Sequence, residues 1–447
     1  MPIEPPSDHQ SRRARARRFP LRYMRLIRKH WRHAGPIPKL VLGLGVMVLL
    51  LIGCLELTET GRWRPITGER PLKPAMVDRT IRVRLGGKGP RTSARLSVTT
   101  SFNLAEASTG KIRAAGHAAV RDATIRPAPG RGIQLGREII PCDDIILTPQ
   151  RDAAVVLDDQ TYRGELRIQR SGDELVLVNN IDVEAYIRGV LRGELPRYFH
   201  PESFKAQAVA ARTYALWEKQ KGSAARLYEM LDNEGSQMYI GVRGEDSVAV
   251  QAVEQTRGQV CMWDDHGVDR IFCTYYSSAC GGLSQGVNNV KPNDPDVPPL
   301  RGNVVCKDCY LAPHYRWGPV KLSKTDVTKR IVAHYPALER LGTITDLKAK
   351  AITTDGRIIR IELLGGNGQT DTLMGEDFRL AVGGRVLKST NFELESKGSD
   401  FIFKNGKGFG HGIGLCQWGM ETKARQGWDY QRILSTYYPG SKIKTIY

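Results

Sequence analysis

A single carboxylic acid, Glu194, stands where two predicted helices meet. The first helix is predicted to begin after Asp182 and to stop at Gly193, and the second to begin at Pro201. A carboxyl group just past a helix C-terminus faces the negative end of the helix dipole, which disfavours ionisation, although the next helix N-terminus acts in the opposite sense. Apolar neighbours such as Leu195 would also raise the pKa of the carboxyl group. Glu194 is therefore a candidate general acid, with a solvated loop glutamate as the alternative.

Alternating glycines near the C-terminus form a second candidate feature, at positions 406, 408, 410, 412 and 414. In an extended segment they would lie on one face, with Phe409, His411 and Ile413 on the other. The bare face would admit another backbone or a flat sugar ring. His411 would present an imidazole for hydrogen bonding or proton transfer, and Gln417 a further polar contact. A structural glycine-rich turn explains the spacing equally well.

Four of the eight cysteines have a spacing that suits metal binding: Cys273, Cys280, Cys306 and Cys309. A structural Zn²⁺ site is one interpretation. Two disulfides in an exported protein are another, and free thiols are the third.

The sequence contains no serine hydrolase, zincin or dinucleotide-binding motif in a context that supports it.

The N-terminal region indicates a membrane protein. Residues 1–39 contain eleven Lys or Arg and two acidic residues, and residues 40–55 carry no charge. This run is slightly short for a spanning helix, which needs about 20 apolar residues, but the basic flank places the N-terminus in the cytoplasm and the body outside it. Alternatively, Leu51-Ile-Gly-Cys54 resembles the lipobox of bacterial lipoproteins, in which Cys54 would be acylated. Both interpretations export the body.

The remaining elements predict an α+β fold, with mixed helices and antiparallel sheets and an N-terminal membrane helix. Short alternating runs predict strands at 81–85, 95–98, 153–157, 166–168 and 175–178, and later at 270–276, 352–364 and 370–378. Apolar periodicity predicts helices at 201–217, 248–256 and 326–334. The predicted organisation is a basic cytoplasmic tail (1–39), a transmembrane anchor or lipoprotein signal (40–57), a linker (58–78), a β-rich part (79–181) and a core that contains Glu194 (182–447).

The net charge of +19 suits an anionic partner such as a cell-wall polymer. Nucleic-acid binding is not expected, because the basic tail has few aromatic residues for stacking and adjoins the apolar run.

Several segments occur in the order typical of one protein family: residues 162–166, 178–196, 205–214, 275–282, 375–379, 387–392, 408–419 and 437–440. Together they resemble the stage II sporulation protein D / LytB amidase-enhancer family over about residues 80–447. The resemblance implies a lytic transglycosylase that cleaves peptidoglycan glycan strands between N-acetylmuramic acid and N-acetylglucosamine and leaves a 1,6-anhydro end.

The family's catalytic glutamate, in a Gly-Glu-Met-Pro-like motif, falls on Glu194, with Leu195 in place of Met. The resemblance also implies that residues 182–447 form the catalytic core around a central groove, with substrate-binding roles for Gln207, Arg212, Tyr214, Ser278, His411 and Gln417. Two departures, Cys416 for the usual Ser and Met420 for the usual Ala, would weaken the substrate-side fit without affecting Glu194.

One carboxyl group suffices for lytic cleavage, because the sugar's own 6-hydroxyl replaces the second carboxylate that hydrolysis usually needs. No cofactor is then required for catalysis. Some family members hold zinc near the Ser-Ser-x-x-Gly-Gly segment, which supports structural zinc at the cysteines. LytB-type relatives are described as amidase enhancers, so the alternative function is a non-catalytic, peptidoglycan-binding enhancer whose partner is an N-acetylmuramoyl-L-alanine amidase.

Overall fold

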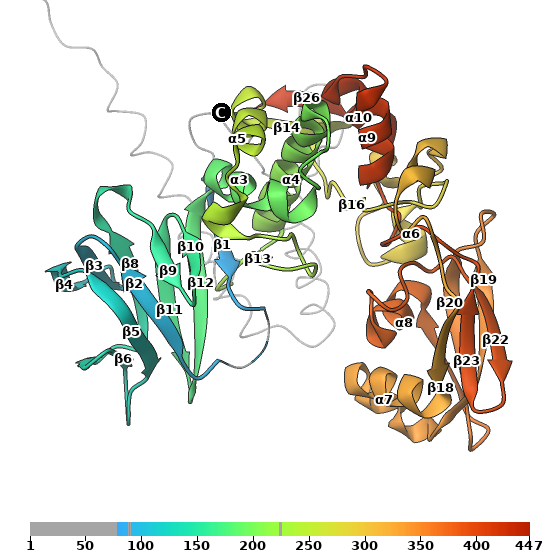
Figure 1. Ribbon diagram of the computed structural model, residues 1–447, viewed down its shortest axis with the longest axis horizontal. Coiled ribbons are helices and arrows are strands. Elements are labelled where there is room, and N and C mark those ends of the chain that lie inside the picture. The colour runs from blue at the N-terminus through green and yellow to red at the C-terminus, as the bar shows by residue number, and fades with distance from the viewer. Residues whose placement is uncertain (1–77, 88, 90, 223–225) are drawn as a thin grey trace, which may run out of the picture. The chain divides into compact units, whose positions relative to one another are not determined.

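Strands β1 to β12, together with the later strand β13, build two sheets in the first part of the structure (Figure 1). The computed structural model describes residues 78–447, except for 88, 90 and 223–225. The predicted tail (1–39), anchor (40–57), lipidation site (Cys54) and all but the last residue of the linker (58–78) lie outside the described residues. Within the described part of the chain, no helix is both long and apolar enough to cross a membrane.

The two sheets are built almost wholly from antiparallel pairs, as the alternating pattern predicts. One has the strand order β13-β1-β12-β11-β8-β3-β4 and the other β10-β9-β2-β5-β6-β7, and only β1 and β13 pair in parallel. Every strand predicted before residue 182 is confirmed. The bounds are β1 (Thr80–Arg84), β2 (Ala94–Val98), β3 (Phe102–Glu106), β4 (Ile112–His117), β5 (Val120–Pro127), β6 (Ile133–Leu135), β7 (Glu138–Ile140), β8 (Asp144–Pro149), β9 (Val155–Leu157), β10 (Gln160–Tyr162), β11 (Glu165–Ser171), β12 (Glu174–Asp182) and β13 (Met230–Leu231).

Three helices follow the sheets: α3 (Val183–Glu194), α4 (Pro201–Lys221) and α5 (Ser247–Gln255). Both predicted helix starts are confirmed. The Asp182 side chain accepts a hydrogen bond from the Glu184 N–H and so caps α3, and the His200 side chain caps α4 in the same way. Two predicted ends are wrong, because α3 continues through Gly193 to Glu194 and α4 runs beyond residue 217 to Lys221.

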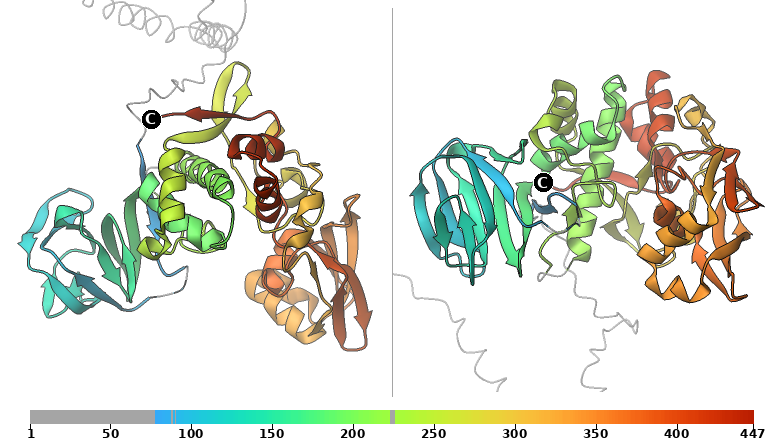
Figure 2. Two further views of the ribbon diagram at one scale, coloured as in Figure 1. Left: turned by 45° about the horizontal axis from the view of Figure 1, so that its top comes forward. Right: turned by 60° about the horizontal axis from the view of Figure 1, so that its bottom comes forward.

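Residues 317–403 enclose a separate hydrophobic cluster. Two three-stranded sheets, β18-β23-β22 and β19-β20-β21, lie beside α7 and α8, drawn in orange in Figure 2. The predicted strand at 370–378 is only half right, because β21 ends at Met374 and Gly375 begins α8. The bounds are β18 (Val320–Ser323), α7 (Lys324–His334), β19 (Ile344–Ile352), β20 (Ile358–Gly365), β21 (Thr370–Met374), α8 (Gly375–Val382), β22 (Glu393–Lys397) and β23 (Asp400–Lys404).

The remaining elements connect these parts. A larger hydrophobic cluster draws buried residues from the sheets, from α3, α4 and α5, and from the C-terminal helices, so the β-rich part and the helices share one core. The bounds are β14 (Gln259–Asp265), β15 (Val268–Ile271), β16 (Tyr276–Ser277), α6 (Val287–Val290), β17 (Arg316–Trp317), β24 (Gly406–Lys407), β25 (Leu415–Cys416), α9 (Gln417–Arg425), α10 (Tyr430–Tyr437) and β26 (Lys442–Thr445).

Candidate functional site

The carboxyl group of Glu194 is half-buried at the end of α3 and is surrounded by hydrogen-bond donors. The backbone N–H of Met238 and the hydroxyl of Tyr276 donate to Oε1 at 2.8 and 3.0 Å, and Nε2 of Gln417 lies 3.4 Å from Oε2. Burial raises the pKa of Glu194 above its ordinary value, and the three hydrogen bonds oppose this rise without cancelling it. The carboxyl group of Glu194 therefore keeps its proton to a higher pH than an ordinary glutamic acid, and its carboxylate form still has hydrogen-bond donors around it.

Two glycines on α3 allow the Met238 backbone to reach Glu194. A Cβ atom at Gly193 would lie 2.1 Å from the Met238 carbonyl oxygen, and one at Gly189 would lie 2.5 Å from the ring of Tyr239. The Ile240 N–H also donates to the Gly189 carbonyl at 3.1 Å. Gly193 is thus needed for close approach of a loop, and not as the helix stop that the sequence predicted.

The other two donors lie at a pair of short strands, with Tyr276 in β16 and Gln417 directly after β25 at the start of α9. β16 and β25 pair in parallel, with Tyr276 opposite Leu415. Just beyond this pair, the Trp418 N–H donates to the Ser278 carbonyl at 3.0 Å. This pairing brings Tyr276 and Gln417 to the same carboxyl group, although the two strands, Tyr276–Ser277 and Leu415–Cys416, lie far apart in the sequence. Ser278 is half-buried beside Gln417, and its contacts to the C-terminal segment are made through its backbone.

An aromatic pair lies beside the residues that meet at Glu194. Tyr198, in the turn between α3 and α4, is 61% exposed, and its ring centroid lies 6.4 Å from that of Trp418. Trp418 directly follows Gln417 and also packs edge-on against Phe199. Exposed aromatic rings of this kind supply flat apolar faces for a ligand.

The glycine run is not the extended strand that its alternation predicts. Gly408, Gly410, Gly412 and Gly414 have φ values of 81°, 102°, 80° and 65°, which favour glycine strongly. Their small size serves protein packing: a Cβ at position 410 would lie 2.7 Å from the Cβ of Ser277, and one at 412 would lie 2.9 Å from Cζ of Arg357. The proposed two-faced arrangement is therefore wrong.

His411 lies in an aromatic row and not against Glu194. Its ring centroid is 5.5 Å from that of Tyr275, which is in turn 6.1 Å from that of Tyr214. Burial lowers the pKa of His411 to about 3, so the imidazole is neutral near pH 7. Its Nδ1 accepts the Ile413 N–H at 3.0 Å, which leaves the proton on Nε2. His411 can therefore donate a hydrogen bond, but it is poorly suited to act as an acid.

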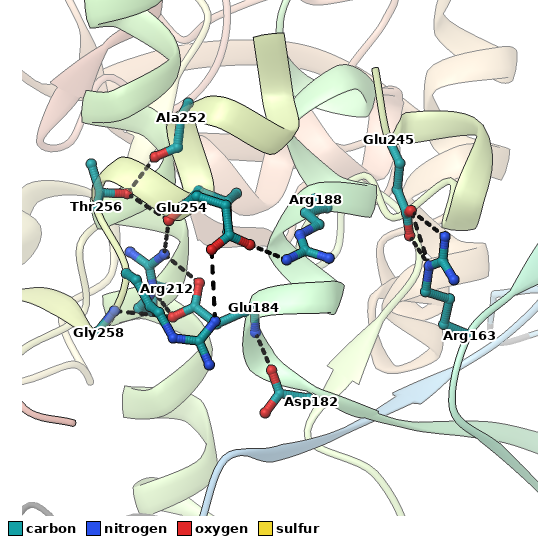
Figure 3. A network of polar contacts seen from close by, with 12 residues as sticks. Arg163, Asp182, Glu184, Arg188, Arg212, Glu245, Ala252, Glu254, Thr256 and Gly258 are labelled. Carbon is teal, nitrogen blue, oxygen red and sulfur yellow. Dashed lines mark hydrogen bonds and ion pairs between the residues drawn. The ribbon is translucent and has the colours of Figure 1, made fainter. Parts of the chain in front are cut away.

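Two predicted substrate-binding residues are buried. Arg212 is fully buried and forms a two-point ion pair with Glu184, with distances of 2.9 and 2.6 Å (Figure 3). Glu184 also accepts hydrogen bonds from the Gly258 N–H and the Tyr447 hydroxyl. The predicted role of Arg212 in sugar positioning is therefore wrong, because its guanidinium is enclosed and paired. Gln207 is equally enclosed, and its amide atoms have no hydrogen-bond partner among the described residues.

The structure brings together Cys280, Cys306, Cys309 and Cys416, whose sulfur atoms all lie within 4.8 Å of one another. All seven described cysteines are free thiols, so the disulfide alternative is not adopted. The predicted fourth member, Cys273, is not in the group. It lines a separate cavity of about 320 Å³ together with Trp217 and Trp263. Cys416 takes its place, which no local spacing could have indicated.

Comparisons with known proteins agree on one family. Residues 171–263 match the SpoIID family, described as stage II sporulation protein. An uncharacterized protein of Brachyspira hyodysenteriae is 30% identical over 284 residues, which cover 63% of this chain and 72% of that protein. The chain belongs to the SpoIID/LytB family.

Two further SpoIID/LytB relatives come from Bacillus subtilis strain 168. The protein named stage II sporulation protein D is 25% identical over 60% of this chain and 75% of its own length. The protein named amidase enhancer is 28% identical over 58% of this chain, but only 40% of its own length is matched. The segment that matches the family contains Glu194, Gln207, Arg212 and Tyr214.

Two of the groups that contact Glu194, the Tyr276 hydroxyl and the Met238 backbone N–H, were not predicted from the sequence. Tyr276 lies in residues 275–282, one of the segments that resemble the family, and its hydroxyl group could have marked it as a candidate hydrogen-bond donor at the site. Met238 contributes only its backbone N–H, for which the side-chain sequence carries no signal.

Proposed function

We propose that this protein is a lytic transglycosylase that cleaves peptidoglycan glycan strands between N-acetylmuramic acid and N-acetylglucosamine. One observation carries the proposal: a half-buried carboxyl group, Glu194, has a raised pKa and is held by three hydrogen-bond donors. A raised pKa is what a general acid needs near neutral pH. The SpoIID/LytB membership supports a role in cell-wall remodelling.

The proposed reaction uses Glu194 twice. The protonated carboxyl group donates its proton to the glycosidic oxygen as the bond from the anomeric carbon to that oxygen breaks. The resulting carboxylate then accepts the proton of the 6-hydroxyl as that oxygen bonds to the anomeric carbon and closes the 1,6-anhydro ring. Met238 N–H, Tyr276 and Gln417 stabilise the carboxylate between these steps. General acid–base help of this kind is worth about 10²–10⁴-fold.

The exposed ring of Tyr198 and the adjacent Trp418 are proposed to contact sugar rings, and His411 and Ser278 to donate hydrogen bonds farther along the strand. We also propose that residues 40–57 anchor the chain in the membrane, or that Cys54 carries a lipid, with the body outside the cytoplasm. The excess of basic residues suits the anionic cell wall.

A second function is favoured by the relative that is named amidase enhancer. In that case the same surface binds peptidoglycan or a cell-wall amidase without cleaving a glycosidic bond. The two proposals differ in their products. Full-length protein is incubated with glycan strands stripped of stem peptides, and separately with intact peptidoglycan and an N-acetylmuramoyl-L-alanine amidase.

The transglycosylase proposal expects anhydro-ended fragments in the first reaction, detected by mass spectrometry, and their loss in Glu194→Gln. The enhancer proposal expects no fragments in the first reaction and faster amidase action in the second. Fragments that survive Glu194→Gln would contradict the role assigned to Glu194.

A further inference from the structure

Four buried thiols meet at a point that the proposed reaction does not use. The sulfur atoms of Cys280 and Cys309 are 3.7 Å apart, and all four sulfurs lie within 4.8 Å of one another. In a tetrahedral site with Zn–S bonds of about 2.3 Å, the sulfurs would be about 3.8 Å apart. The spacing of the thiols therefore fits one zinc ion.

The surroundings of the thiols also suit zinc-bound thiolates. The Cys280 N–H donates to Cys416 Sγ at 3.3 Å, and the Tyr437 hydroxyl lies 3.1 Å from Cys306 Sγ. Donors of this kind orient metal ligands and stabilise negative charge on sulfur. The absence of a side chain at Gly419 leaves room for the four thiols, because a Cβ atom at this position would clash with Cys306 Sγ at 2.4 Å.

The ligands come from three segments of the chain, and two of these lead directly to Glu194. Cys416 immediately precedes Gln417, and Cys280 lies four residues after Tyr276. The segment that contains Cys306 and Cys309 contacts α9 as well, since Lys423 pairs with Asp308 at 2.8 Å. A metal bound by all three segments would fix the side of the site that carries Tyr276 and Gln417.

We propose that Cys280, Cys306, Cys309 and Cys416 bind one structural Zn²⁺ and that this ion holds Tyr276 and Gln417 in place against Glu194. Each Zn–S bond replaces a thiol S–H bond, and the proton passes to solvent. Four protein ligands leave no open position, so the ion stabilises structure and takes no part in the reaction. Zinc binding by these cysteines does not depend on the transglycosylase proposal. Only the catalytic importance of holding Tyr276 and Gln417 against Glu194 rests on that proposal.

The first test measures metal content. Full-length protein is purified in detergent without chelator, and its zinc and free thiols are quantified. We expect one zinc per chain, loss of that zinc in Cys416→Ser and Cys280→Ser, and full retention in Cys273→Ser, the matched control for a buried cysteine outside the group. Wild-type protein without zinc, or with its thiols joined in disulfides, would overturn the metal site, as would zinc that remains in Cys416→Ser.

The second test uses wild-type protein only, so that misfolded variants cannot obscure the result. Zinc is removed with a chelator, and hydrogen–deuterium exchange is followed by mass spectrometry before and after zinc is restored. Peptides covering residues 276–282 and 415–420 should exchange faster without zinc and recover with it, while β11 and β12 stay unchanged. Unchanged exchange in these peptides would overturn the positioning role. Neither readout needs a glycan substrate, so each can succeed or fail separately from the proposed activity.

Discussion

The hydroxyl of Tyr276 lies 3.0 Å from Oε1 of Glu194 and shares that oxygen with the backbone N–H of Met238. Both groups donate, so both favour the carboxylate over the protonated acid and oppose the effect of burial. The balance between burial and donors sets the pH range over which Glu194 can deliver a proton, and each side of this balance can be changed separately.

Replacing Tyr276 by Phe removes one donor to the carboxylate. The pKa of Glu194 should rise further, so the loss of kcat/KM at high pH should occur at a higher pH than in wild type. The rate at the optimum should fall by about tenfold or less, the worth of one hydrogen bond. Tyr335→Phe, in the cluster of residues 317–403, is the control. If the pH profile of kcat/KM did not shift in Tyr276→Phe, or shifted to lower pH, Tyr276 would not be a donor that stabilises the Glu194 carboxylate.

Glu194→Gln should stabilise the protein at neutral and higher pH. Because the folded-state pKa is raised, wild-type stability falls as pH increases from about the ordinary value of 4.5 through the raised value. The neutral glutamine removes this loss and still accepts the hydrogen bonds at Oε1. Denaturant unfolding at several pH values should show the two proteins converging at low pH. If Glu194→Gln were less stable than wild type above the raised pKa, burial could not be the main cause of the raised pKa of Glu194.

Gly193→Ala tests whether the loop must approach α3 closely. The added methyl group would displace the Met238 carbonyl, which lies 2.1 Å from its position, and with it the donor to Glu194. A displacement of about 1 Å at a catalytic group can cost about 100-fold in rate. Gly222→Ala, where the new Cβ has only ordinary contacts at 3.5 Å and beyond, should keep full activity. Equal activity of the two variants would show that the close approach is unimportant.

His411 should make the protein sensitive to acid. Its pKa is about 3 in the folded protein against an ordinary 6.5, so the unfolded chain binds an extra proton between these values and stability falls as pH drops through this window. His411→Asn keeps an acceptor for the Ile413 N–H but does not titrate. The stability difference between wild type and variant should therefore change between pH 6.5 and about 3. A constant stability difference across this window would contradict a His411 imidazole that stays neutral in the folded protein.

The sequence predicted local structure best where local chemistry determines it. Asp182 and Pro201 mark the starts of α3 and α4, and alternating apolar residues mark β1, β2, β11 and β12. It failed where distant segments decide. Gly193 was predicted to end a helix because glycine is a common helix stop. Its actual role is to allow close approach of Met238, a residue distant in the sequence.

The candidate site shows the same division. Glu194 and Gln417 were chosen from the sequence and lie together, whereas Arg212 was chosen and is instead committed to Glu184. A guanidinium in a helix is equally suited to a substrate or to a buried carboxylate, and only tertiary packing decides between them. Cys416 could not be grouped with Cys280 from spacing, because a parallel strand pair brings their segments together.

In the proposed reaction, the single carboxyl group of Glu194 cleaves the glycan without adding water. The most direct test digests stripped glycan strands in ¹⁸O-labelled water and analyses the new ends by mass spectrometry. We expect ends that are one water molecule lighter than hydrolysis products and carry no ¹⁸O, with at least about a 100-fold loss of product in Glu194→Gln. New reducing ends that contain ¹⁸O, or product formation that does not depend on Glu194, would contradict it.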